Sequence, residues 1–419
     1  MPHAPHAPAL ADLPAPPAGK TGWPWTEASS HPANQLATGM DLPAVAIVTP
    51  SYQQAEFLEE TIRSVLLQGY PKLSYAIMDG GSTDGSLAII EKYAPWLDDW
   101  VSAADGGQAQ AIDNGFQRLP GELLNWVNSD DVLTQDAVWK AVSEYSRHPG
   151  AVLLYGNADE ISRDGARLGP ATHARQVDRQ YLIKVANAIP QPSAFFNRQA
   201  YETAGKLDHS LYWTLDYDLW IRLADLGPIV YIPETLSQMR IYPQAKTSRG
   251  EPAMFDEFRV VGERYGGFGL LNQMVGWLVP DLLPKALAAL NEGDFEHGQT
   301  WLTSVIANDP SRQSDSSMAE LLAHAAWLRI DEAGATSQAA VAWTRRVCQG
   351  LPATFIHPKR VERQALGLFY EALAFRNFRQ GQIGDGLRHV ARAVAQDHRR
   401  AANRGLWSIT LRSLVRLLA

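Results

Sequence analysis

Between residues 44 and 156 the sequence alternates short, β-branched or apolar runs with longer segments of helical periodicity. The short runs predict strands at 44–49, 73–79, 100–103, 122–127 and 151–156. The segments between them predict helices at 55–68, 86–94, 108–119 and in a stretch that ends near 147. Strands that alternate with helices form a mostly parallel sheet with helices on both faces. We therefore expect an α/β fold in this part of the chain.

Polar clusters follow four of the predicted strands. They read TPSYQQ, DGGSTDGS, ADGGQ and NSDD in chain order. Ligands of such sheets bind at the carboxyl ends of the strands, where these clusters fall. The sequence therefore predicts one binding site built from these four segments.

The NSDD cluster places Asp130 and Asp131 side by side at the end of an apolar strand. Adjacent carboxylates repel each other unless a cation or a hydrogen-bond donor neutralises them. Oxygen ligands of this kind suit Mg²⁺ or Mn²⁺, which complete their coordination with water and substrate phosphates. The cluster predicts a metal site and a phosphate-bearing substrate. The alternative is that these aspartates only cap the following helix.

Five motifs in this order, TPSYQQ, DGGSTDGS, ADGGQAQAIDNG, NSDD and LDYDLW, make residues 45–242 resemble the inverting family 2 glycosyltransferases of GT-A fold. The resemblance implies a nucleotide-diphosphosugar transferase fold with Mn²⁺ or Mg²⁺ as cofactor. It implies transfer of a sugar from a nucleotide-diphosphate donor to a glycan or lipid-linked acceptor, in surface polysaccharide biosynthesis.

The resemblance also assigns residues to the donor site. Pro50 and Tyr52 would lie beside the base and ribose, where an aromatic ring offers a stacking surface. Asp79 would hydrogen-bond the base. Asp105 and Gln108 would contact the donor at the start of a helix, a place where backbone N–H groups favour phosphates.

The sequence departs from the family pattern at three positions. Gly80 stands where the family more commonly has a second acid, and Asn128 replaces the first acid of its D-x-D motif. The final acid of that motif is kept as Asp130, the expected metal ligand, and the adjacent Asp131 is expected to share that role. Leu215 replaces the Glu of a Glu-Asp pair, and Asp216 remains as the expected catalytic base, which takes the proton from the acceptor hydroxyl.

Four further polar residues near these motifs have open roles. Asp218 is expected to cap a helix, although it is the second candidate for the base. Arg240 could bind phosphate from a closing loop or form a structural ion pair. Gln191 and Ser193 could face the donor or the acceptor.

Composition changes at both ends of this region. Residues 1–40 are rich in Pro and Ala, which predicts a disordered leader. A transferase domain is expected at 41–253 and a helical domain at 254–419. Two stretches of the helical part align at an offset of 88, with Gly293 on Gly381 and Gly298 on Gly386. Such glycines are typical of helix-hairpin repeats resembling tetratricopeptide units, with ordinary helical packing as the alternative.

Charge is distributed unevenly along the chain. The formal net charge of −8 argues against a nucleic-acid binder. Residues 355–419 hold 12 Lys and Arg against 4 Asp and Glu, a net charge of about +8 that leaves about −16 elsewhere. Basic and apolar residues alternate through 404–418, so this helix would lie on an anionic membrane surface or pack on its own domain. Cys348 is the single cysteine, and no signal peptide is apparent, so a cytoplasmic protein is expected.

Two other functions fit parts of this pattern. A nucleotidyltransferase shares the α/β architecture, but it has no use for a base at Asp216. A non-catalytic scaffold would explain the replacements at Asn128 and Leu215, whereas the retention of Asp130 and Asp216 weighs against it.

Overall fold

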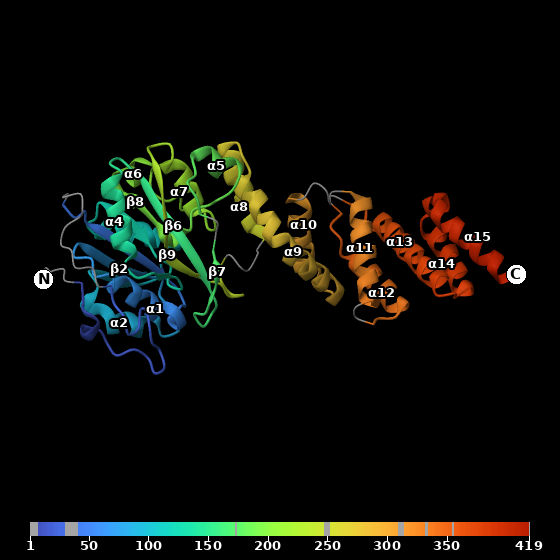
Figure 1. Cartoon of the computed structure of the whole chain (residues 1–419), viewed down its shortest axis with the longest axis horizontal. Helices are drawn as coiled ribbons and strands as arrows, with labels where there is room; N and C mark the ends of the chain where they lie inside the picture. The colour runs from blue at the N-terminus through green and yellow to red at the C-terminus, as the bar shows by residue number, and fades with distance from the viewer. Residues whose placement is uncertain are drawn as a thin grey trace. The chain divides into compact units, whose positions relative to one another are not determined.

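The computed structural model describes residues 7–29, 41–171, 174–246, 252–308, 314–331, 334–353 and 356–418. The chain divides into two compact units. The first comprises residues 1–250 and 257–273, and the second comprises residues 251–256 and 274–419 (Figure 1). The domain limits expected from the sequence, 41–253 and 254–419, stay predictions.

The first unit is built on a nine-stranded sheet in its described part. Its strands are β1 (Val45–Ser51), β2 (Leu73–Asp79), β3 (Asp99–Ser102), β4 (Leu123–Trp126), β5 (Val132–Leu133), β6 (Leu153–Ile161), β7 (Arg167–Pro170), β8 (Ala194–Asn197) and β9 (Ile229–Arg240). Their order is β3-β2-β1-β4-β8-β6-β9-β5, and β7 pairs with β6.

The five strands predicted from the sequence are all present, within three residues at their starts, and the α/β fold is confirmed. The sheet is nevertheless more mixed than expected. Strand β8 runs antiparallel to both β4 and β6, and β5 and β7 are also antiparallel to their partners. Strand β6 is antiparallel to β8, which is itself antiparallel to β4, so β6 runs in the same direction as β4. Strands β1, β2 and β9 share this direction as well. The carboxyl ends of these strands therefore lie along one edge of the sheet.

Helices cover both faces of the sheet. The helices of this unit are α1 (Ala55–Leu66), α2 (Ser86–Tyr93), α3 (Gln108–Arg118), α4 (Ala137–Arg147), α5 (Arg179–Lys184), α6 (Arg198–Thr203) and α7 (Leu215–Leu223), and α8 (Pro252–Tyr265) belongs to it from Glu257 onward. Helices α1, α2 and α4 share one apolar core with the sheet. On β4 and β8 the side chains alternate between faces, so Leu123 and Phe195 enter this core whereas Trp126 and Phe196 point the other way.

An aromatic cluster fills the second face. Trp126 stacks on Trp220 of α7 with ring centroids 5.7 Å apart, and Phe196 contacts both rings. Phe116 of α3 and Tyr201 of α6 pack edge-on against each other in the same cluster. This packing holds α3 and α7 against the same face of the sheet.

Part of the leader is ordered, which corrects the expectation of disorder for residues 7–29. The guanidinium of Arg63, fully buried on α1, donates hydrogen bonds to the carbonyl oxygens of Pro14, Pro24 and Trp25 at 2.8–3.1 Å. Leu13 and Trp25 are buried as well. A buried charge requires such partners, and the leader supplies them. Residues 1–6 and 30–40 lie outside the described residues.

The second unit is helical. Its helices are α9 (Gly269–Glu292), which begins in the first unit, α10 (Phe295–Asn308), α11 (Asp315–Asp331), α12 (Ser337–Gln349), α13 (Pro358–Arg379), α14 (Ile383–Gln396) and α15 (Arg404–Leu418). Among the described residues, no helix is long and apolar enough to cross a bilayer.

The two aligned glycine pairs have matching structural roles. Gly293 and Gly381 both adopt positive φ, at 90° and 76°, in the turns before α10 and α14. A Cβ on Gly298 would lie 2.6 Å from Leu290, and one on Gly386 would lie 2.6 Å from Phe378. Each pair thus makes one tight turn and one close helix crossing, as expected for helix hairpins.

Candidate active site

The acidic motif follows β4 as a tight turn. The Asp131 N–H donates to the Asn128 carbonyl at 3.0 Å, and the Thr61 hydroxyl donates to the Asp131 carbonyl at 2.7 Å. This turn sends the side chains of Asp130 and Asp131 in different directions, so the two carboxylates have different surroundings.

Asp131 points inward. One of its carboxylate oxygens accepts the Arg240 N–H at 3.2 Å and the other accepts the Asn128 amide at 3.1 Å. Burial raises the pKa of Asp131 to about 8, and the neighbouring Asp130 adds to that shift. A side chain that is 5% exposed and bonded at both oxygens is poorly placed to bind a metal, so the geometry argues against the expected ligand role of Asp131.

Asp130 is only half-buried, and its Oδ2 accepts a hydrogen bond from the Tyr242 hydroxyl at 2.8 Å. Burial is the largest influence on its carboxyl group and raises its pKa. No group of three His, Cys, Asp or Glu side chains in the described parts of the chain is placed so that it could hold a metal ion. A divalent cation here would therefore depend on Asp130, substrate phosphates and water, a donor set that Mg²⁺ accepts.

Asn128 is the centre of an amide network. Its Oδ1 accepts from Gln108 Nε2 at 2.8 Å, and its Nδ2 donates to Gln191 Oε1 at 3.0 Å. Gln191 in turn donates to the Trp126 carbonyl at 2.7 Å. The neutral amide thus joins the end of β4 to the start of α3. Gln191 and Ser193 are buried, which gives both a structural role.

Asp216 lies in the first turn of α7 and is half-buried. Burial raises the pKa of its carboxyl to about 6, and the nearby Lys246 opposes that rise. The Lys246 amine is itself partly buried, and this burial lowers its pKa to about 8 against the opposing influence of Asp216 and Glu257. A carboxylate that is ionised at neutral pH but more basic than usual suits a general base.

Glu257 of α8 fastens the loop that leads into α7. Its carboxylate accepts the backbone N–H groups of Tyr212, Trp213 and Thr214 and the Thr214 hydroxyl, at 2.6–2.8 Å. These bonds fix the backbone immediately before Asp216. Preorganisation of this kind is what an acid–base site requires.

Asp218 has a different role from the one expected. It is fully buried and forms ion pairs with Arg222 and Arg264, both at 2.7 Å, and accepts the Tyr265 hydroxyl at 2.6 Å. Asp218 is therefore neither an exposed helix cap nor a second base. The structure leaves Asp216 as the accessible acid of this motif.

Arg240 is likewise structural. It is 4% exposed, pairs with Glu60 at 3.0 Å and donates to the carbonyl oxygens of Asp130, Ser162 and Arg163. With its guanidinium engaged in this way, the ion-pair alternative fits Arg240 better than phosphate binding.

Two of the expected nucleotide residues, Tyr52 and Asp105, lie on either side of Gly80. A Cβ at this glycine would lie 3.3 Å from the Tyr52 ring and 3.5 Å from the Asp105 carboxylate. Tyr52 is 62% exposed and so offers its ring to solvent, whereas Pro50 is buried within β1. A side chain at position 80 would enter the space between this ring and this carboxylate.

Asp79 is committed to the loop that follows β2. Its two carboxylate oxygens accept hydrogen bonds from the Gly81 and Ser82 N–H groups and from the Ser82 and Ser102 hydroxyls, at 2.6–3.1 Å. Its contact with a base stays a prediction. The observed bonds make Asp79 the organiser of the loop that carries Gly80.

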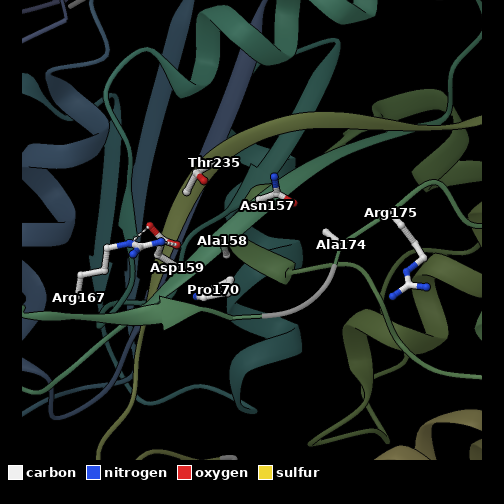
Figure 2. A pocket seen from close by; sticks show the side chains of 8 residues that line it. All are labelled: Asn157, Ala158, Asp159, Arg167, Pro170, Ala174, Arg175 and Thr235. Atoms are coloured by element: carbon white, nitrogen blue, oxygen red, sulfur yellow. Dashed lines mark hydrogen bonds and ion pairs between the residues drawn. The ribbon is translucent and has the colours of Figure 1, made fainter.

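A separate pocket of about 320 Å³ lies among β6, β7 and β9 (Figure 2). It contains none of the predicted site residues. Arg167 on its wall pairs with Asp159 through two hydrogen bonds of 2.6 and 2.7 Å. Because Asp159 neutralises Arg167, this arginine contributes little positive charge to the pocket.

Three residues of the site escaped the sequence analysis: Tyr242, Lys246 and Glu257. Tyr242 and Lys246 follow the strand that carries Arg240, so a search of that strand end for further polar residues could have found them. Glu257 comes from a helix beyond the motifs, and no local pattern indicates it.

The model of the family described as "Glycosyl transferase family 2" matches residues 46–205. Chondroitin synthase of Escherichia coli is 26% identical over 241 residues, which cover 56% of this chain and 34% of that protein. The putative teichuronic acid biosynthesis glycosyltransferase TuaG of Bacillus subtilis is 28% identical over 136 residues, 32% of this chain and 53% of TuaG. The chain spans about a fifth to two thirds of the length of the curated relatives it matches.

Two solved structures align at low identity. Staphylococcus aureus TarS 1–349 in complex with UDP-GlcNAc has a TM-score of 0.45 at 12% identity, over 86% of this chain and 92% of that one. The mannosyltransferase PcManGT of Pyrobaculum calidifontis, in complex with GDP-Man and Mn²⁺, has a TM-score of 0.42 at 18% identity, over 72% and 86%. The family match confirms the resemblance inferred from the five motifs and, with the mixed sheet, the expected GT-A fold class.

Proposed function

We propose that this chain, whose residues 46–205 belong to family 2 of the glycosyltransferases, transfers a sugar from a nucleotide-diphosphate donor to an acceptor hydroxyl with inversion. One observation carries the proposal. Asp216, the accessible acid of its motif, lies near Lys246, and hydrogen bonds connect Lys246 through Gln108 to Asn128 of the acidic motif. A base and a diphosphate-binding motif are thereby joined in one site.

In the proposed reaction, Asp216 accepts the proton of the acceptor hydroxyl. The acceptor oxygen forms a bond to the anomeric carbon as the bond between that carbon and the diphosphate oxygen breaks, and the nucleoside diphosphate leaves with the electron pair. Mn²⁺ or Mg²⁺ held by Asp130 would neutralise the charge on the departing diphosphate. Tyr52 and Asp105 would border the nucleotide, with Gly80 leaving room between them.

The acceptor is proposed to be a growing glycan or a lipid-linked one in surface polysaccharide synthesis. Two relatives support this class by their names, chondroitin synthase and the putative teichuronic acid biosynthesis protein.

A peripheral membrane contact of α15 fits such an acceptor. Trp407, Leu411 and Val415, four residues apart along the helix, are 43%, 61% and 65% exposed, and Arg404 and Arg412 flank them. An exposed apolar stripe beside arginines suits an anionic lipid surface.

A thermal-shift screen of nucleotide sugars with and without Mn²⁺ tests the donor, because a ligand of the native state raises the unfolding temperature. We expect a nucleotide sugar to stabilise the protein more with Mn²⁺ than without it. The stabilising donor is then incubated with glycan acceptors, and nucleoside diphosphate release is measured. Donor binding without release on any acceptor would favour the scaffold. A parallel incubation with a nucleoside triphosphate and a sugar 1-phosphate covers the other alternative, since pyrophosphate release there would favour a nucleotidyltransferase.

A further inference from the structure

Lys246 belongs to the segment that follows β9, six residues beyond the end of the strand. Its amine donates to the Oε1 of Gln108 at 2.7 Å and lies 3.9 Å from the centre of the Tyr212 ring. Gln108 is the first residue of α3, and its other amide atom bonds to Asn128 in the acidic motif. The Lys246 amine is therefore two hydrogen bonds from the position where a donor diphosphate is proposed to bind.

The Lys246 amine forms no close ion pair with any described residue. Its hydrogen bond goes to a neutral amide, and the carboxylates of Asp216 and Glu257 act on it from a longer distance. Arginines nearby differ in this respect, since Arg240 pairs with Glu60 and Arg163 pairs with Glu56. The positive charge of Lys246 is therefore hydrogen-bonded to a neutral amide oxygen but is not neutralised by an adjacent carboxylate.

We propose that Lys246 is the cationic side chain that binds the donor diphosphate and that Gln108 holds it in place until the donor arrives. This inference rests on the proposed function and assigns one contact within it. A lysine amine is a compact charge with three N–H donors, so it can exchange the Gln108 oxygen for a phosphate oxygen without losing its place beside Tyr212. The positive charge of Lys246 would stabilise the leaving diphosphate, and the negative charge of Asp216 in the same site would accept the acceptor proton.

Calorimetry with inorganic pyrophosphate tests this contact without requiring the sugar, the nucleotide or an acceptor. We compare the wild type with Lys246→Met, Lys246→Arg and a control, Lys184→Met, which removes the same charge from an exposed lysine at the end of α5. All titrations are run with Mn²⁺ and repeated with EDTA, because the lysine contact does not need the metal.

We expect Lys246→Met to weaken pyrophosphate binding about tenfold or more, as for a lost charge-assisted hydrogen bond. Lys246→Arg should recover most of the affinity, and Lys184→Met should match the wild type. Equal affinity of Lys246→Met and the wild type would overturn the inference while leaving the transferase proposal intact. Failure of the wild type to bind either pyrophosphate or any nucleoside diphosphate would instead overturn both.

Discussion

Replacement of Asp216 by Asn tests the proposed base most directly. The carboxylate is half-buried at the start of α7, and Asn keeps its size and most hydrogen bonding but cannot accept a proton. General base catalysis contributes roughly 10²- to 10⁴-fold, so we expect transfer to fall by at least the lower figure. Donor affinity should stay close to that of the wild type.

The pKa of Asp216 also predicts how the reaction rate depends on pH. A base must be ionised, and with a pKa of about 6 roughly half of the molecules are competent at pH 6 and about a tenth at pH 5. The value of kcat/KM should therefore rise with pH up to about 7. If protonated Lys246 binds the diphosphate, kcat/KM should fall again above its pKa of about 8. The Asn variant should lose the acidic limb and keep the alkaline one.

The assay is nucleoside diphosphate release in the presence of acceptor, measured from pH 5 to pH 9 at several donor concentrations. Asp225→Asn is a suitable control, because Asp225 lies just beyond the other end of α7, is exposed, and pairs with Arg179 at 2.6 Å. An Asp216→Asn variant that keeps the wild-type rate, or that keeps the acidic limb, would refute the assignment.

Three further predictions concern the metal, the fold and the membrane. Asp130→Ala should weaken Mn²⁺-dependent binding of a nucleoside diphosphate more than binding of the nucleoside, and equal calorimetric affinities for the diphosphate in variant and wild type would contradict the metal assignment. Asp218→Ala removes the ion pair of Arg222 and one of the two ion pairs of Arg264, which keeps Asp208 at 2.9 Å, and should lower the free energy of unfolding by about 3 kcal/mol in urea titrations; a loss below about 1 kcal/mol would refute its structural role. Replacing Trp407 and Leu411 by Ser should abolish sedimentation with phosphatidylglycerol vesicles, and undiminished sedimentation would exclude α15 as the contact.

The sequence predicted those parts of the molecule that depend on local pattern. Alternating strands and helices indicated the sheet, and the polar segments at strand ends indicated the site. The antiparallel strands β5, β7 and β8 are short or pair with segments far along the chain, so no local periodicity distinguishes them.

Local pattern could not show which of two adjacent aspartates is buried and which is accessible to a ligand. Asp130 and Asp131 are equivalent in the sequence, yet the turn after β4 directs Asp131 toward Arg240 and leaves Asp130 half-exposed. Asp218 looked like a helix cap because its partner Arg264 lies 46 residues away on another helix. Tertiary contacts of this kind also bring Lys246 to Gln108, which is 138 residues distant.

The buried guanidinium of Arg63 makes one position on α1 dependent on a segment about forty residues earlier in the chain. Three of its four hydrogen bonds end on carbonyl oxygens of the leader and the fourth on the Tyr93 hydroxyl, so without the leader the arginine would lose most of the partners that a buried charge requires. Backbone carbonyls impose no particular side chains on the leader, so away from the buried Leu13 and Trp25 its composition can change while its path is kept. Across related proteins, Arg at this position should occur together with such a segment, and chains without the segment should carry an uncharged residue there.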